Sequence, residues 1–258
     1  MDNPRPTRPD ILSLRGVTPR HAVLFPAFLA ICALGMAALY LVLGKLDHLH
    51  PGLVNPDLFR FVNLTEEANL PTWFSALLWQ VAAMLAFFIA NRHRTGGWPH
   101  RAYWIGMVPL FLFLSLDEAG KVHESIGDVI GRNSESTGWR EYTYSWVLFG
   151  MALVTLVGVA YTRLLVRLRR PFALLLILSA AVFLLGAVVV ESISASAHKG
   201  TIDRLPFGQT FARMIAWEET LEKLGAILLI HTLLRVLALD APPYLARPAD
   251  SRARRASG

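Results

Sequence analysis

The sequence predicts an all-α integral membrane protein, a bundle of six transmembrane helices with both termini in the cytoplasm. Six apolar runs alternate with polar segments, and most approach the ~20 residues that a helix needs to cross a hydrocarbon core. The tails and alternate loops hold 16 of the 25 Lys and Arg residues but only four of the 19 Asp and Glu residues. Such Arg-rich segments stay on the cytoplasmic side, so the acid-rich loops are expected outside.

The expected spans are residues 22–44, 72–90, 102–116, 142–166, 171–190 and 217–239. The third run is short, but the polar stretch 117–130 keeps a helical period, which predicts one long helix that emerges on the outer side. In the outer loop 45–71, we expect a short helix capped by Thr65 that stops before Pro71. The predicted division is a cytoplasmic tail at 1–21, a six-helix bundle with outer loops at 22–240 and a disordered cytoplasmic tail at 241–258.

Composition excludes several classes. With 54% hydrophobic residues in a chain of 258, there is no room for a separate soluble domain of ordinary size. The sole cysteine, Cys32, lies inside the first span, so neither an intrachain disulfide nor a thiol-rich metal site is expected. The Arg clusters suit the bilayer and its anionic lipid headgroups on the cytoplasmic side, and no nucleic-acid pattern is present.

The third helix carries the first candidate residues. At about 100° per residue, Asp117, Lys121, Glu124 and Asp128 share one face, with Glu118 and His123 at its flanks. A solvated face explains Glu124 and Asp128 equally well. It explains Asp117 and Glu118 less well, because both lie at the edge of the hydrocarbon.

The fifth and sixth helices supply further polar groups. Glu191 and His198 are two turns apart on one face, where they either share a ligand or form a hydrogen-bonded tie between helices. Glu218 and Glu219 are explained by the dipole at the start of the sixth helix, and Glu219 can also pair with Lys223. Glu222 lies deeper, and an intramembrane Glu is a functional candidate.

Together with the loop residues Glu66 and Asn69, these helices bring acidic groups to one outer level. Crowded carboxylates must be protonated, paired with Lys121 or Lys223, or bridged by a cation. Carboxylates with His suit a divalent Zn, Fe or Mn ion, whereas oxygen ligands alone suit Ca²⁺ or Mg²⁺. The expected metal ligands are Glu118, Glu191, His198 and Glu222, and the expected further polar lining is Asp117, Glu66, Asn69, Glu218 and His231.

His231 is expected near the middle of the membrane, one turn from Arg235. It is interpreted either as a satisfied hydrogen bond between helices or as a proton relay toward the inner side.

The motif Leu114-Ser115-Leu116-Asp117-Glu118 with His123-Glu124, the Asn-Leu-Pro-Thr-Trp-Phe-Ser block and the Glu-Glu-x-x-Glu-x-x-Gly opening of the last span resemble an uncharacterised family of bacterial multi-pass membrane proteins. The resemblance covers most of the membrane region and implies a location in the bacterial inner membrane. It implies no activity. The chain is also faintly similar to alkaline-ceramidase-like membrane hydrolases. It departs from them because it has six predicted spans instead of seven, and because only His123 and His198 lie near the candidate site.

Three function classes remain. The first is a metal-dependent membrane enzyme that acts on a lipid or other amphiphilic substrate, with His123 or Glu124 as the catalytic general base on a metal-bound water. The second is a cation- or proton-coupled transporter or channel, in which the carboxylates load an ion and His231 continues the route. The third is a non-catalytic subunit of a membrane complex.

Overall fold

The computed structural model describes residues 17–66, 68–92, 98–133, 146–198, 210–239 and 243. These residues form an all-α fold, with no β-strand among them. Five of the described helices are long and apolar enough to cross a membrane, which is compatible with a multi-pass membrane protein. The elements are α1 (His21–Leu49), α2 (Pro56–Val62), α3 (Leu70–Arg92), α4 (Trp98–Gly120), α5 (Val122–Asn133), α6 (Trp146–Arg167), α7 (Arg170–Leu184), the π-helical segment η3 (Leu185–Val190), α8 (Glu191–His198) and α9 (Phe211–Leu237).

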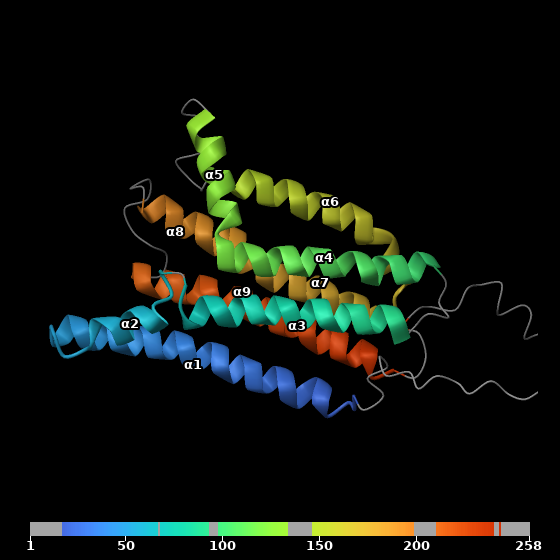
Figure 1. Cartoon of the computed structure of the whole chain (residues 1–258), viewed down its shortest axis with the longest axis horizontal. Helices are drawn as coiled ribbons and strands as arrows, with labels where there is room; N and C mark the ends of the chain where they lie inside the picture. Colours follow the sequence, from blue (N-terminus) through green and yellow to red (C-terminus); the bar gives the residue numbers. More distant parts are fainter. Residues whose placement is uncertain are drawn as a thin grey trace, which may run out of the picture.

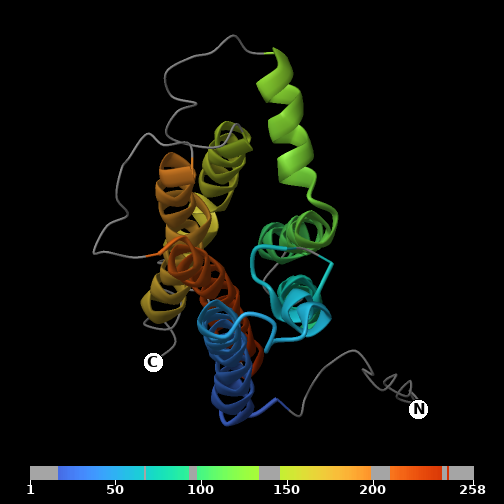
Figure 2. The ribbon, with the colours of Figure 1, turned by 90° about the vertical axis from the view of Figure 1, so that its left-hand side faces the viewer.

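The long helices run back and forth between two ends of the bundle (Figures 1 and 2). One end receives the starts of α1, α4 and α7 and carries Arg20, Arg92 and Arg169. We call it the arginine end. The opposite end receives the ends of α4 and α8 and the start of α9, and we call it the acidic end because Asp117, Glu118, Glu191, Glu218, Glu219 and Glu222 belong to its half of the helices.

Helix α9 is the central element of the bundle. It packs against α1, α3, α7, η3 and α8. The half toward the arginine end is apolar, and Ile230, Leu233, Val236 and Leu237 are fully buried there. The half toward the acidic end carries Glu218, Glu219, Glu222 and Lys223, and α9 is not among the five most apolar helices. Neighbouring helices therefore surround the charged stretch that would otherwise meet lipid.

A close approach of backbones joins α9 to α7 and η3. The Ser179 hydroxyl donates to the Gly225 carbonyl at 2.8 Å, inside the core. A Cβ at Gly225 would lie 2.6 Å from the Phe183 backbone nitrogen, and one at Gly186 would lie 2.8 Å from the Glu218 carbonyl oxygen. Small residues at such crossings let helices pack tightly in membranes, so the two glycines fix the position of the α9 carboxylates beside η3.

The prediction of one continuous helix through residue 130 is wrong. Helix α4 ends at Gly120, and Lys121 takes a left-handed conformation with φ 52° before α5 begins at Val122. The Asp117 carboxylate accepts the His123 backbone N–H at 2.7 Å, which caps the new helix. In Figure 2, α5 points away from α4, so the predicted single face from Asp117 to Asp128 does not exist.

The predicted short helix capped by Thr65 is also wrong. Helix α1 continues to Leu49, the short helix is α2, and its cap is Asn55, whose side chain accepts the Asp57 and Leu58 backbone N–H groups. Helix α3 begins at Leu70, with Pro71 in its first turn. Proline fits this position because the first helical N–H groups have no partner within the helix.

The sixth predicted span begins earlier than expected. Helix α9 starts at Phe211, where the Thr210 side chain accepts the Arg213 backbone N–H. Glu218 and Glu219 therefore lie two turns inside the helix. The helix dipole acts mainly within the first turn, so it no longer accounts for these two carboxylates. The predicted tails lie outside the described residues, apart from the segment 17–21 and Pro243.

Candidate functional site at the acidic end of the bundle

A buried lysine lies at the centre of the acidic end. The Lys223 side chain is only 3% exposed and forms an ion pair with Glu219 one turn earlier on α9, as the sequence predicted. Lys223 also lies within electrostatic range of Glu118 on α4 and of Glu222. One ammonium group therefore interacts with three carboxylates from two helices.

Glu118 and Glu222 bring α4, α9 and η3 together. Glu118 interacts electrostatically with Lys223, Glu219, Asp117 and His123. Glu222 points its Cγ toward Gly186 of η3 and lies within electrostatic range of Glu118, Glu218 and Glu191. Because carboxylates in a low dielectric repel one another strongly, this arrangement favours bound protons or cations.

The break between α4 and α5 builds an aspartate–histidine pair. The Asp117 Oδ2 atom lies 3.0 Å from His123 Nδ1, while Oδ1 caps α5. The His123 ring packs edge-on against Trp146 of α6, with ring centroids 5.0 Å apart. A carboxylate that accepts Nδ1–H selects the imidazole tautomer with its lone pair on Nε2.

Trp146 links this pair to α8. Its indole Nε1–H donates to Glu191 Oε1 at 2.8 Å. The start of α6 is held closely against α5, since a Cβ at Gly127 would lie 3.1 Å from the Trp146 backbone nitrogen. Glu191 in turn lies within electrostatic range of Glu218 on α9, and the Ser194 hydroxyl lies beside that same carboxyl group.

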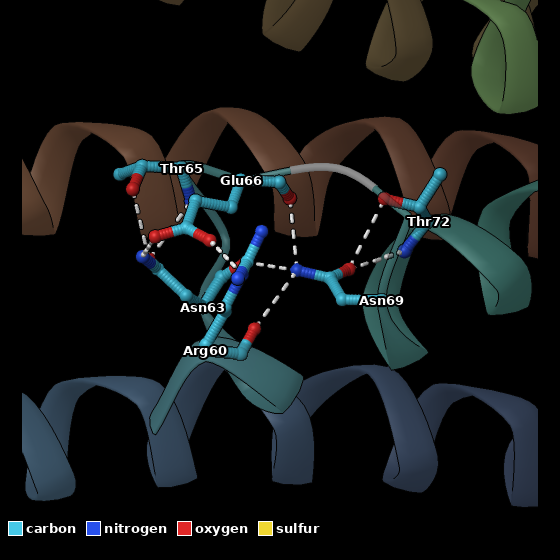
Figure 3. Close-up of polar contacts among 6 residues, drawn as sticks. All are labelled: Arg60, Asn63, Thr65, Glu66, Asn69 and Thr72. Atoms are coloured by element: carbon cyan, nitrogen blue, oxygen red, sulfur yellow. Dashed lines mark hydrogen bonds and ion pairs between the residues drawn. The ribbon is translucent and has the colours of Figure 1, made fainter. Parts of the chain in front are cut away.

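The loop residues Glu66 and Asn69 make contacts of their own (Figure 3). Glu66 pairs with Arg60 of α2 at 3.1 Å and accepts a hydrogen bond from Asn63. The Asn69 amide donates to the carbonyls of Asn63 and Glu66, and its Oδ1 accepts the Thr72 backbone N–H at the start of α3. These two residues organise the turn between α2 and α3.

His231 lies toward the arginine end. Its Nδ1 contacts the carbonyl oxygen of Ala22, in the first turn of α1. This contact lies nearer the arginine end of the bundle than its middle, and the depth of His231 in the membrane stays a prediction. The contact matches the predicted hydrogen bond between helices.

Three candidate positions fall where side chains are not described. The backbones of Glu124, Asp128 and His198 are helical, but their side chains lie outside the described residues, as does all of Glu67. Among the side chains that are described, no three Asp, Glu, His or Cys residues are close enough to hold one metal ion.

The family profile described as Domain of unknown function (DUF8692) matches residues 27–237. The chain belongs to this family. The match begins in the first third of α1 and ends at the last residue of α9, so every polar residue discussed at the acidic end falls inside it. No curated protein and no solved structure matches the chain.

Two residues of this site were missed in the sequence. Trp146 lies near the start of the predicted span 142–166, where it is typical of an aromatic residue at the membrane interface, although an indole N–H near an acidic helix end is also a common partner for a carboxylate. Ser194 is a small residue of the kind that permits close helix packing, which the sequence alone does not distinguish from a site residue. Its position one turn after Glu191 was the available signal.

Proposed function

We propose that the protein is an enzyme of the bacterial inner membrane that acts in the outer leaflet on a lipid or another amphiphilic substrate. The observation that carries the proposal is the Asp117–His123 pair, at 3.0 Å and packed on Trp146. A carboxylate that orients a histidine is the arrangement that general-base catalysis needs. Polar groups gather at the acidic end, whereas the other half of α9 is apolar, so a substrate would enter from one side only.

In this proposal, His123 is the general base and Asp117 positions it. Asp117 holds Nδ1–H, so Nε2 would take a proton from water or a substrate hydroxyl. A divalent Zn, Fe or Mn ion would be held by only part of the predicted set Glu118, Glu191, His198 and Glu222, because the three described carboxylates are not close enough to share one ion. Glu124, the second candidate base, would follow His123 on α5.

We further propose six membrane crossings with both termini in the cytoplasm. The alternating course of the helices supports repeated crossing of the membrane. The exposed Arg167, Arg169 and Arg170 at the junction of α6 and α7 support a cytoplasmic arginine end, because they suit anionic headgroups. Alkaline phosphatase fusions near Gly52, Gly138 and Gly200 should be active, and fusions near Gly97 or after Pro248 should be inactive. Activity at the C-terminus would overturn the orientation and exchange the inner and outer assignments.

The enzyme proposal is tested with purified protein in vesicles of mixed bacterial lipids, with products followed by mass spectrometry. His123→Ala should lower turnover by about 100-fold or more, the usual contribution of a general base. Asp117→Asn should lower kcat and change KM little, because it misplaces the histidine without removing a substrate contact. Glu66→Gln is the control, since Glu66 pairs with Arg60 in a separate turn. Lipid products that do not depend on His123 would refute the assignment of the base, and no products at all would refute the enzyme.

The second candidate function is cation- or proton-coupled transport, favoured by the buried Lys223 among Glu118, Glu219 and Glu222. A proton or cation route along α9 is disfavoured, because the half of α9 toward the arginine end is apolar and because His231 contacts Ala22. A pH-sensitive dye inside the same vesicles distinguishes the two, because only a transporter moves protons across a sealed membrane. Vesicles with neither activity would favour the third class, a subunit whose acidic end binds a partner.

A further inference from the structure

Helix α5 runs crosswise to the bundle. In Figure 1 it stands across the long helices at the acidic end, and in Figure 2, which looks along the bundle from that end, it extends sideways beyond them. In the chain it lies between the end of α4 at Gly120 and the start of α6 at Trp146, and both of these helices contain candidate membrane spans. A helix that lies across two spans, at the level where both leave the bilayer, runs along the membrane surface.

The apolar residues of α5 share one face. Val122, Ile126 and Val129 are four and three positions apart, so they lie along one side of the helix. The bundle buries Gly127 of the same helix, whereas it leaves Val129 52% exposed and Val122 and Ile126 half-buried. This face therefore needs a further apolar neighbour.

The contact with α6 shows which way the apolar face points. Gly127 is buried against the start of α6, and Ile126, one residue earlier, is turned from it by about 100° around the helix. In Figure 2, α6 lies beside α5, and α5 runs away from the bundle. A right-handed turn of that size brings Ile126 to the side of α5 that faces the arginine end, which is the side of the bilayer. Ser125, about 100° further back and exposed, is turned away from the bilayer.

Lipid surrounds the spans on that side of α5. Only 6% of the apolar stretch of α6 is buried within the protein, and only 22% of that of α4. The apolar surface exposed along such spans meets acyl chains. The apolar face of α5 continues this lipid-facing surface at its edge, so its neighbour is the bilayer itself.

We propose that α5 is an in-plane membrane anchor, in which Val122, Ile126 and Val129 rest on the upper parts of the acyl chains in the leaflet at the acidic end. Helices of this kind lie about 5–10 Å into the boundary between headgroups and acyl chains. His123 belongs to the first turn of α5, so the contact sets the height of this histidine at the same boundary. The membrane contact does not rest on the enzyme proposal.

The test labels the wild-type protein from the lipid side. The protein is placed in vesicles of phosphatidylethanolamine and phosphatidylglycerol with a trace of phosphatidylcholine that carries a photoactivated diazirine on one acyl chain. The diazirine lies near the headgroup in one preparation and at the chain end in the other. After illumination, trypsin cleaves after Lys121 and Arg132, which releases residues 122–132, and it also releases residues 141–163 with most of α6. Mass spectrometry then measures the lipid label on each peptide.

The peptide 122–132 should be labelled by the probe near the headgroup and much less by the probe at the chain end. The peptide 141–163 should be labelled by both probes, because α6 contains a span, and it is the internal reference.

Two variants locate the contact on the helix. Ile126→Asn should lower the label on 122–132 by about threefold or more, because a polar side chain replaces the apolar one that seats the helix in the bilayer. Ser125→Asn is the matched control, since it changes the adjacent, exposed position, and it should be labelled like the wild type. The label on 141–163 should stay the same in both variants.

Three results would overturn the proposal. The first is an unlabelled 122–132 beside a labelled 141–163 in the wild type, which would mean that water or protein, including a second copy of the chain, covers the face. The second is stronger labelling of 122–132 from the chain end than from the headgroup region, which would place α5 inside the bilayer. The third is equal labelling of 122–132 in Ile126→Asn and the wild type, which would mean that lipid reaches α5 elsewhere. None of these readouts depends on turnover.

Discussion

Replacing Gly225 with alanine should separate α9 from α7. The new Cβ would lie 2.6 Å from the Phe183 backbone nitrogen and 2.8 Å from its Cα, whereas ordinary contact begins near 3.4 Å. The helices must therefore move apart by several tenths of an ångström. Overpacking of this kind costs about 1–3 kcal/mol, and weakening the Ser179 bond to the Gly225 carbonyl adds about 0.6 kcal/mol.

Alanine itself favours the helix over glycine by about 1 kcal/mol, so the net loss for Gly225→Ala should be about 0.5–2.5 kcal/mol. Gly35→Ala in α1 is the matched control, because nothing lies within 4 Å of its Cβ position. It should be neutral or stabilising by up to about 1 kcal/mol. Unfolding by titration with SDS in mixed micelles, followed by circular dichroism, measures both variants. Equal unfolding midpoints for Gly225→Ala and Gly35→Ala would refute the close contact between α7 and α9.

Lys223→Met should destabilise the bundle by about 3–5 kcal/mol, because it leaves the Glu219 carboxylate without its ion-pair partner. The double variant Lys223→Met with Glu219→Gln should recover most of that loss in the same titration. Lys45→Met, on the exposed end of α1, is the control and should change the stability little. A double variant as unstable as Lys223→Met alone would contradict the reasoning. Asn69→Ala should cost about 1–2 kcal/mol and speed protease cleavage in the α2–α3 turn, because it removes the cap of α3 and the bonds to two carbonyls. Asn91→Ala, at the opposite end of α3, should change unfolding by less than about 0.5 kcal/mol, and cleavage at the wild-type rate in Asn69→Ala would count against the role of Asn69.

The long helices could be predicted because hydrophobicity and length carry that signal directly. Five of the expected runs coincide with helices that are long and apolar enough to cross a membrane. The sixth coincides with α9, whose charged first half reduces its apolar character. Six crossings and the orientation of the termini stay predictions, since helix length and composition alone do not assign sides.

The breaks in the helices could not be predicted from periodicity. The segment 117–130 keeps its helical period across Lys121, so the pattern gives no sign of the left-handed residue there. Asp117 has two possible roles in the sequence. An acidic residue six positions before His123 can cap a new helix, or it can belong to the polar face of a continuous one, and the structure shows the cap. The periodicity also gives no sign of the π-helical segment η3, in which Gly186 packs closely against α9.

The sequence predicts which end of the bundle carries the polar residues, but it predicts less well which of these residues contact one another. The Glu219–Lys223 pair follows from local spacing on one helix, and the structure confirms it. The link from Trp146 to Glu191 joins residues 45 positions apart, so it depends on how α6 packs and not on any local pattern. The same holds for Ser194 and Glu218, which lie on different helices.

The central position of α9 has a consequence for biogenesis. The five more apolar helices precede α9 in the chain, so they reach the membrane before the helix that packs against α1, α3 and α7. Until α9 arrives, the small residues Ser179 and Gly186 on α7 and η3 have no partner. Carboxylates and an ammonium group make α9 costly to insert alone, but the waiting helices offer it polar and closely fitting surfaces. The most polar of the long helices is therefore the last to join the bundle, and a chain stalled before Phe211 would present an open membrane assembly to quality control.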